Sequence, residues 1–262
     1  MSWKFELIGK RPKMNKPIFI EGLPGIGNVG KVAVDFIVDK TKAKKLYEVS
    51  SYSMPHSVFV NEEHLVEMPS IEIHYARHRG QDILFLTGDV QPIDEVTCHE
   101  FCEQLLDILE SYACKDIVTT GGIGLQEAPK SPKVYVTGNS KSAVQRFTEG
   151  TDATDRIYGV VGPIVGVTGL LLGLAGKRKI PAAAILAETL GHPMYLGMKG
   201  AREILKILNA KLSLKLDLNE LDKEIKEIES EVLKKTKELG QVSKDTAMKK
   251  LAKYGKDVTY IG

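Results

Sequence analysis

The sequence predicts a three-layer α/β/α fold, built on a mostly parallel, mixed sheet and followed by a C-terminal helix and tail. Short apolar segments alternate with amphipathic helical segments through most of the first 216 residues. Several of the short segments are apolar on both faces, which is typical of parallel strands covered by helices on both sides. After about Leu216 the composition changes, because glycine and proline disappear from residues 217–239 and Lys, Glu and Leu dominate.

The predicted elements follow one another in a regular order. Residues 18–21 form the first apolar strand and residues 32–41 the first amphipathic helix, with a glycine-rich turn between them. Residues 57–89 contain several strand-like pieces with no helix between them, so part of the sheet is expected to be antiparallel. A further helix is expected at 95–112, and further strands are expected at 46–52, 71–77, 82–89, 116–122 and 182–189.

Residues 159–176 form the most apolar later segment of the chain. They carry many glycines and one proline, and they fall short of the roughly 20 strongly apolar residues that a membrane-spanning helix requires. We therefore expect this segment to be closely packed inside the α/β body, and we expect no membrane partner.

The overall charge and the cysteines argue against several classes of protein. The chain has 262 residues, with 36 basic and 34 acidic side chains and a net charge of +2, so no overall field attracts nucleic acid or an anionic membrane. Its three cysteines are odd in number and show no paired spacing, which indicates a reducing compartment, the cytoplasm, rather than a disulfide framework. The N-terminal residues show no long apolar run and no small-residue cleavage site, so no signal peptide is expected.

The segment "EGLPGIGNVG" raises the question of dinucleotide binding. Gly25, Gly27 and Gly30 satisfy G-x-G-x-x-G between a predicted strand and a predicted helix. A dinucleotide-binding fold also needs an acidic residue at the tip of the next strand, and the candidate, Glu48, lies inside that strand. The same glycines suit a sharp turn or a close approach of two backbones. We favour this structural interpretation and expect no cofactor.

Polar residues stand at the expected carboxyl ends of several strands: Glu21, Asp89, Thr119, Thr120 and Glu188. In an open parallel sheet this edge binds ligands, and two carboxylates that meet there would suit acid and base chemistry, as in a nucleosidase. The alternative is that these side chains cap helix N-termini and bind loop amides. We favour the alternative, so no catalytic residue is predicted.

Two cysteines four residues apart suggest a metal site at first sight. Cys98 and Cys102 flank His99. However, Cys98, Phe101, Cys102 and Leu105 recur at helical spacing and form one apolar face. The two thiols are therefore interpreted as core residues, and no metal is expected.

The C-terminal part divides into a helix over 217–240 and a tail over 241–262, after a core domain over 1–216. Apolar residues recur every three or four positions of the helix, as in a coiled-coil seam: Leu218, Leu221, Ile225, Ile228 and Val232. Asp217 and Glu220 match a capping box, and Gly240 matches a helix stop. The pattern leaves open whether this helix protrudes or packs at the edge of the core domain. The tail is polar and basic before it ends in "VTYIG".

Five segments, taken together and in order, resemble a known family. They are "EGLPGIGNVG", "TTGGIG", "GVVGPIVGVTGLLLGLA", "AAAILAETLGHP" and "AREILKILNAKLSLKLDLNELDKEIKEIE". The pattern is similar to that of the proteasome assembly chaperone family in its archaeal form, and the resemblance covers the chain from Pro17 to Leu239. It implies a phosphorylase-like α/β core, no catalysis, and a homo-oligomer that binds the 20S proteasome.

The resemblance also implies where that partner binds. Proteasome activators of this kind end in a hydrophobic residue, a tyrosine and one further residue, which enter pockets between neighbouring subunits of the proteasome α-ring. The candidate contacts here are Val258, Tyr260, Ile261 and the carboxylate of Gly262. The tyrosine supplies buried area with a polar handle, the carboxylate can pair with a lysine, and several tails on one oligomer add avidity.

The tail departs from that pattern by one position. Tyr260 is third from the end instead of second, which changes the distance from phenol to carboxylate by about 3.5 Å. The tail therefore either docks in a variant mode or packs on its own core, and the sequence leaves both open.

Three functions are compatible with these patterns. The leading one is a non-catalytic proteasome-interacting protein, either an assembly chaperone or an ATP-independent activator. The second is a nucleoside- or nucleotide-binding enzyme that uses the glycine-rich turn and the strand-end carboxylates. The third is a scaffold that engages an unrelated partner through the helix at 218–239.

Overall fold

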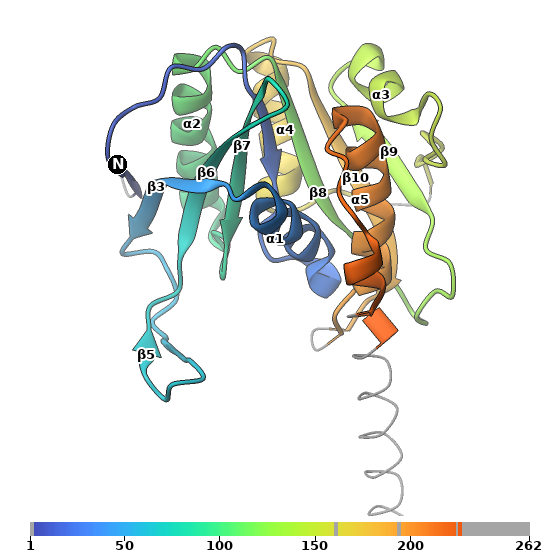
Figure 1. Ribbon diagram of the computed structural model, residues 1–262, viewed down its shortest axis with the longest axis horizontal. Coiled ribbons are helices and arrows are strands. Elements are labelled where there is room, and N and C mark those ends of the chain that lie inside the picture. The colour runs from blue at the N-terminus through green and yellow to red at the C-terminus, as the bar shows by residue number, and fades with distance from the viewer. Residues whose placement is uncertain (1–2, 160–161, 193–194, 224, 227–262) are drawn as a thin grey trace, which may run out of the picture. The chain divides into compact units, whose positions relative to one another are not determined.

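The chain has an eight-stranded mixed sheet at its centre (Figure 1). The structure is a computed structural model that describes residues 3–159, 162–192, 195–223 and 225–226, and it divides into two compact units, 1–216 and 217–262, each described by itself. The sheet belongs to the first unit. Its strands, in spatial order, are β1 (Trp3–Leu7), β3 (Lys44–Ser51), β6 (Ile71–His78), β7 (Gln81–Gly88), β2 (Ile18–Glu21), β8 (Asp116–Leu125), β10 (Ala182–Leu190) and β9 (Val134–Gly138).

The four central strands of this sheet are parallel. β7, β2, β8 and β10 run in one direction, and antiparallel pairs add β6, β3 and β1 on one side and β9 on the other. The central strands are apolar runs because both of their faces are buried, as in Ile83–Leu86. Arg79 and Gly80, which join β6 to β7, both have positive φ, as a type I′ hairpin turn requires. The predicted mixed α/β sheet, with its antiparallel part in residues 57–89, is confirmed.

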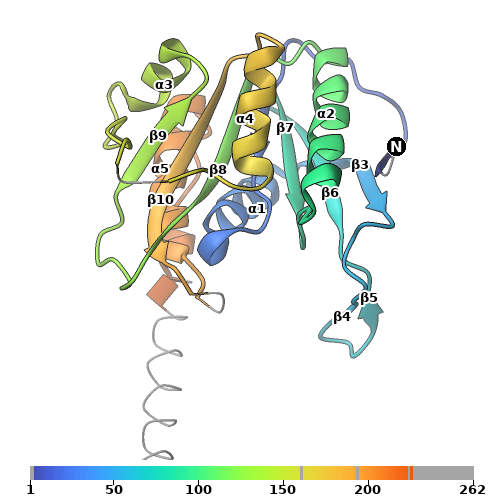
Figure 2. The same ribbon diagram turned by 180° about the vertical axis from the view of Figure 1, so that it is seen from behind.

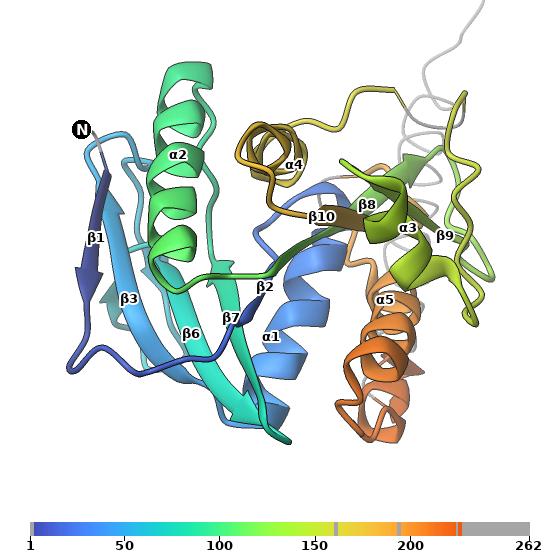
Figure 3. The same ribbon diagram turned by 90° about the horizontal axis from the view of Figure 1, so that it is seen from above.

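Helices cover both faces of the sheet, which gives the three predicted layers (Figure 3). α1 (Val29–Thr41) and α5 (Met198–Leu212) pack together on one face, and α2 (Glu95–Ser111) and α4 (Val167–Lys177) pack together on the other. α3 (Lys141–Thr148) contacts β9 at the edge of the sheet.

Alternation along each strand divides the core between the two faces. Phe19 of β2 lies in one cluster with Phe101 of α2 and Leu171 of α4. The alternation of side chains places Ile18 and Ile20 on the opposite face, toward the layer of α1. All five of these side chains are buried.

Residues 167–176 of the apolar segment form most of α4 and pack on the α/β body as expected, whereas Val165, just before the helix, is exposed. Arg178, directly after α4, contacts three carboxylates of α2: its guanidinium pairs with Glu103 and lies 2.6 Å from Asp107 and 2.8 Å from Glu110. This cluster connects the C-terminal end of α4 to the C-terminal half of α2. Among the described residues, no helix combines the length and the apolar character that crossing a membrane requires.

A hairpin projects from the body of the first unit beyond the carboxyl end of β3 (Figures 1 and 2). Its strands are β4 (Phe59–Val60) and β5 (Val66–Glu67), which form a separate two-stranded sheet. We call residues 52–68 the arm.

In the second unit, residues 219–223 and 225–226 are helical. The predicted helix over 217–240 extends past the described residues, and the predicted tail over 241–262 lies outside them. Both therefore stay predictions.

Candidate functional site

The carboxyl ends of the parallel strands form one edge of the sheet, and most of the candidate residues lie there. β2 leads into the glycine-rich turn, β7 into α2, and β10 into α5. Because parallel strands end together, their following loops share this edge, which is where ligands bind in open α/β sheets. We call it the carboxyl edge.

The glycines of the turn allow it to lie directly against β8. A Cβ atom on Gly30 would stand 2.5 Å from the main-chain oxygen of Thr120, and one on Gly122 of β8 would stand 2.2 Å from that of Ile26. Gly27 has φ +62°, a conformation that side chains rarely adopt. These contacts explain the glycines as positions where two backbones meet, which supports the structural interpretation of the G-x-G-x-x-G pattern.

Glu21 is a fully buried carboxyl group at the end of β2. Its side chain is 0 % exposed, and it accepts hydrogen bonds from the amide of Leu23 at 2.9 Å and from the hydroxyl of Thr168 at 3.2 Å. Burial raises the pKa of Glu21 to about 7, and the bonds from Leu23 and Thr168 oppose that rise. The group therefore titrates in the physiological range inside the fold.

The other strand-end residues have partners of their own. The hydroxyl of Thr120 donates to the main-chain oxygen of Glu21 at 2.7 Å. Asp89 accepts bonds from the amide and the hydroxyl of the neighbouring Ser70 at 3.0 and 2.8 Å. Such loop bonds are what the structural interpretation of these polar residues expects.

Glu188 and Thr119 complete the set of predicted strand-end residues. Glu188 accepts bonds from the amide of Lys133 at 3.0 Å and the hydroxyl of Tyr135 at 3.2 Å, so it holds the start of β9. Thr119 lies next to Glu21 in the register of β2 and β8, and its buried hydroxyl has no hydrogen-bond partner among the described residues. Glu21, Thr119 and Thr120 are thus neighbours, whereas Asp89 and Glu188 each serve a separate loop or strand.

The cysteines of α2 lie in the core, as their helical spacing predicts. Cys98 and Cys102 are buried free thiols. The contact with Cys98, together with burial, raises the pKa of the Cys102 thiol far above its usual range. Within the part of the chain that the structure describes, no three His, Cys, Asp or Glu side chains come together in a way that would hold a metal ion.

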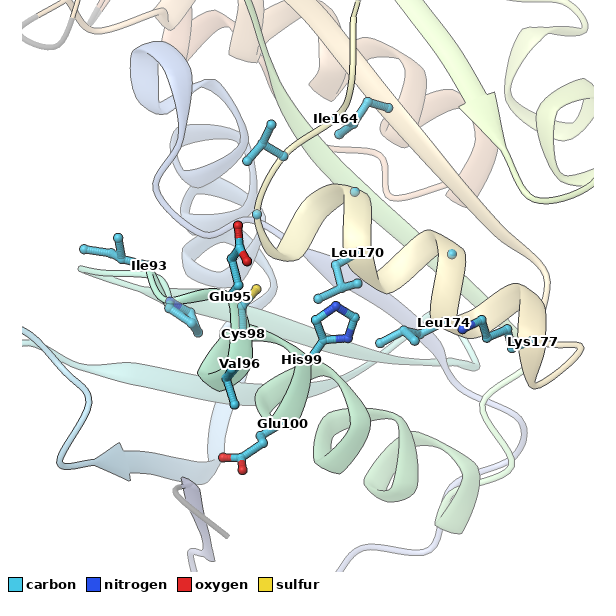
Figure 4. A pocket seen from close by; sticks show the side chains of 15 residues that line it. Ile93, Glu95, Val96, Cys98, His99, Glu100, Ile164, Leu170, Leu174 and Lys177 are labelled. Atoms are coloured by element: carbon cyan, nitrogen blue, oxygen red, sulfur yellow. The ribbon is translucent and has the colours of Figure 1, made fainter.

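A groove runs between α2 and α4, starting at the carboxyl edge (Figure 4). It has a volume of about 810 Å³, and its walls are mainly apolar. Figure 4 shows Leu170 and Leu174 of α4 on one side, His99 of α2 facing them, and Lys177 at the far end. We call this the α2–α4 groove.

The groove and the arm are features that the sequence interpretation missed. Ile93 and Val96 lie on the rim of the groove and are 85 % and 66 % exposed. A signal for Val96 exists in the sequence, because Val96 falls outside the apolar face of α2 that Phe101 and Leu105 define, whereas Ile93 lies in the loop before this helix. An apolar residue off the buried face of a helix marks a surface that has an additional use.

The candidate contacts Val258, Tyr260, Ile261 and Gly262 lie outside the described residues. They stay predictions from the sequence.

The fold and the carboxyl edge define a class of protein: a mixed α/β body with a buried acid at its strand ends, a tightly packed glycine turn and an exposed apolar groove. The chain belongs to the PAC2 family, whose model matches residues 19–235. The family resemblance seen in the sequence is thereby confirmed.

Solved structures and related sequences agree with this membership. The chain is 30% identical to Pyrococcus furiosus PbaB, described as an archaeal proteasome activator, with a TM-score of 0.81 over 90% of this chain and 99% of that one. P. furiosus PbaA, described as an archaeal homolog of proteasome-assembly chaperone, shares the fold at 20% identity, with a TM-score of 0.76 over 97% of this chain and 100% of that one. An uncharacterized protein of Methanocaldococcus jannaschii is 28% identical over 244 residues, which are 91% of this chain and 92% of that protein.

Proposed function

We propose that this chain is a non-catalytic proteasome-interacting protein that acts in the cytoplasm as a homo-oligomer, either as an assembly chaperone or as an ATP-independent activator. The observation that carries the proposal is the 30% identity to PbaB, a proteasome activator, across 90% of the chain. A match of this length extends over most of the chain and is not confined to one motif.

The proposed contact with the α-ring of the 20S proteasome is the C-terminal tail. Val258, Tyr260 and Ile261 supply apolar area, and the carboxylate of Gly262 supplies a charge for a lysine of the pocket. One tail of this size binds weakly, but several tails on one oligomer engage several equivalent pockets of the ring and raise the overall affinity.

A pair of tyrosine variants tests the tail. Tyr260→Ala should weaken binding to archaeal 20S proteasome at least about tenfold, which is the effect of losing one aromatic anchor. Tyr254→Ala, in the same tail but outside the terminal motif, is the matched control and should bind like the wild type. Equal binding by wild type and Tyr260→Ala would reject the tail as the contact. Stimulation of peptide hydrolysis by the 20S proteasome would separate an activator from an assembly chaperone.

A second candidate is a nucleoside- or nucleotide-binding enzyme, and one observation favours it. Glu21 has a pKa of about 7 and lies at the edge where α/β sheets bind ligands. Nearby, Thr120, Thr168 and the glycines at 121–122 line a cavity of about 540 Å³. Thermal-shift measurements with nucleosides and dinucleotides test it, because a ligand of the native state raises the melting temperature by mass action. If none of these compounds raised the melting temperature, the second candidate would be rejected and the proteasome-interacting protein would remain.

A further inference from the structure

Exposed apolar side chains are concentrated at the carboxyl edge. Among the described residues, the large apolar side chains that are exposed fall in the arm, in the loops after β2, β7 and β10, and at the starts of α2 and α4, apart from Ile8 and Tyr158. Monomeric soluble proteins rarely gather apolar surface in this way unless it is covered by a partner. Two shapes make up this surface: the arm is convex and the α2–α4 groove is concave.

The arm is a well-formed hairpin, not a loose loop. Its turn is organised by Asn61, whose side-chain oxygen accepts bonds from the amides of Glu63 at 3.1 Å and Leu65 at 2.9 Å. The side-chain amide of Asn61 donates to Glu67 on the opposite strand at 2.6 Å. These bonds define the shape of the turn at the tip of the arm.

One face of the arm is apolar and has no cover. Val60 and Val66 are cross-strand partners, so their side chains share a face, and they are 67 % and 69 % exposed. In the described part of the chain, β4 and β5 pair only with each other. An isolated two-stranded hairpin is only marginally stable in water. The arm therefore gains stability from a surface that covers these side chains.

The α2–α4 groove matches the arm in length and in apolar character. α4 has 11 residues and lines one wall of the groove, which gives a length of about 16 Å. The arm reaches from Val58 to Glu62, about 13 Å for an extended chain. Both surfaces are mainly apolar, and the groove also carries charged groups of both signs, namely Glu95 and Glu100 of α2 and Lys177 at its far end (Figure 4).

We propose that the arm of one copy of this chain packs into the α2–α4 groove of a neighbouring copy. The proposal rests on the homo-oligomer of the proposed function and names the surfaces that build it. Within one copy the two surfaces do not cover each other, since Val60 and Val66 on the arm and Val165 on the groove rim are all exposed. A second copy of the chain supplies a groove to cover the arm, and an arm to fill the groove.

The exposed apolar side chains supply most of the apolar area that such a joint needs. Seven of them lie on the two proposed contact surfaces, and at about 60–120 Å² each when fully exposed they would bury on the order of 400 Å² of apolar surface. A biological interface needs about 1,000 Å² in total, of which a little over half is apolar. The seven are Val58, Val60, Val66 and Met68 of the arm and Ile93, Val96 and Val165 of the groove rim.

The joint is heterologous, because the arm and the groove are different surfaces. Each copy offers an arm to one neighbour and a groove to another, so successive copies form a ring if the rotation between them closes. A ring carries all of its C-terminal tails in equivalent positions, which is what avidity for a ring-shaped partner requires.

Two charge variants of the full chain test the joint. The arm variant carries Val60→Asp and Val66→Asp, and the groove variant carries Val96→Asp and Val165→Asp. Each places uncompensated carboxylates in the proposed apolar contact, so each should be monomeric in size-exclusion chromatography with light scattering, with association weakened about 100-fold or more. Tyr158→Asp, at an exposed aromatic residue outside both surfaces, is the control and should keep the wild-type mass.

Mixing the two variants gives a sharper result. The arm variant keeps an intact groove and the groove variant keeps an intact arm, so an equimolar mixture should contain a 1:1 dimer and nothing larger. With an arm-to-arm contact the groove variant would associate on its own, and with a groove-to-groove contact the arm variant would do so. The arm variant and the groove variant should melt at similar temperatures as monomers, because the substituted side chains are solvent-exposed.

The outcomes separate this proposal from the proposed function. An oligomeric wild type whose arm and groove variants remain oligomeric overturns the joint and leaves the homo-oligomer. A monomeric wild type overturns both. Monomeric variants whose mixture does not form the dimer overturn the arm-to-groove pairing.

Discussion

Replacing Glu21 by glutamine should remove a pH dependence from the stability of the fold. Glu21 is fully buried, and burial raises its pKa to about 7. Glutamine has nearly the same shape and carries no charge at any pH. Its side-chain oxygen can still accept from the amide of Leu23, and its amide group can donate to the hydroxyl of Thr168.

The expected magnitude follows from the two pKa values. The pKa of Glu21 is about 7 in the folded protein against an ordinary value of 4.5, and at about 1.4 kcal/mol per pKa unit the difference corresponds to about 3 kcal/mol. The folded state holds the proton more tightly than the unfolded state. Glu21 therefore contributes this stability fully below pH 4.5, and the contribution is lost as the pH rises through 7.

The assay is urea unfolding of wild type and Glu21→Gln between pH 5 and pH 8.5. The free energy of unfolding of the variant should exceed that of the wild type by about 2–3 kcal/mol at pH 8.5, and the gap should shrink toward pH 5. Glu188→Gln, on β10, is the control that leaves Glu21 intact. A gap between wild type and Glu21→Gln that is the same at pH 5 and pH 8.5 would refute the reasoning.

Three further substitutions or measurements test the packing. Gly122→Ala should lower the free energy of unfolding by about 1–3 kcal/mol, because its Cβ would stand 2.2 Å from a main-chain oxygen of the glycine-rich turn. Gly25→Ala is the control, because its Cβ would meet nothing within 4 Å, and it should change the free energy of unfolding by less than about 1 kcal/mol. Equal losses of the two variants in urea unfolding would contradict the close approach of the two backbones. Arg178→Ala should lower the free energy of unfolding by about 1–3 kcal/mol, because the guanidinium pairs with three carboxylates of α2. An unchanged melting temperature would show that this cluster does not connect α2 to α4. Two of the three native thiols, Cys102 and Cys114, should react with Ellman's reagent at least about 100-fold more slowly than those of the unfolded chain, because burial raises the pKa of Cys114 to about 12 and Cys102 is fully buried; fast reaction of all three thiols in the native protein would contradict that burial.

The layers of the fold were readable because they depend on local patterns. Strands apolar on both faces predict a sheet covered on both sides, and the helical spacing of Cys98, Phe101, Cys102 and Leu105 predicts the buried face of α2. The missing helix within residues 57–89 predicts the antiparallel part of the sheet. Each of these inferences uses residues that are close together in the chain.

The candidate site was only partly readable, because it depends on contacts between distant segments. The sequence places Glu21, Asp89 and Glu188 at strand ends, but it does not say that Glu21 is fully buried while the other two bind loops. The groove joins Ile93 to Val165, which are far apart in the chain, and the exposure of each depends on how α2 and α4 pack. Pattern analysis finds a buried helix face more easily than a surface shared by two helices.

The most direct test of proteasome recognition through the tail is the affinity of archaeal 20S proteasome for two versions of the protein. One is the full chain and the other ends at Lys256, which removes Val258, Tyr260, Ile261 and Gly262. Both should have the same oligomeric mass, because the arm and the groove are present in each. We predict that the full chain binds and that the shortened chain does not, and equal binding by the two would contradict the role of the tail.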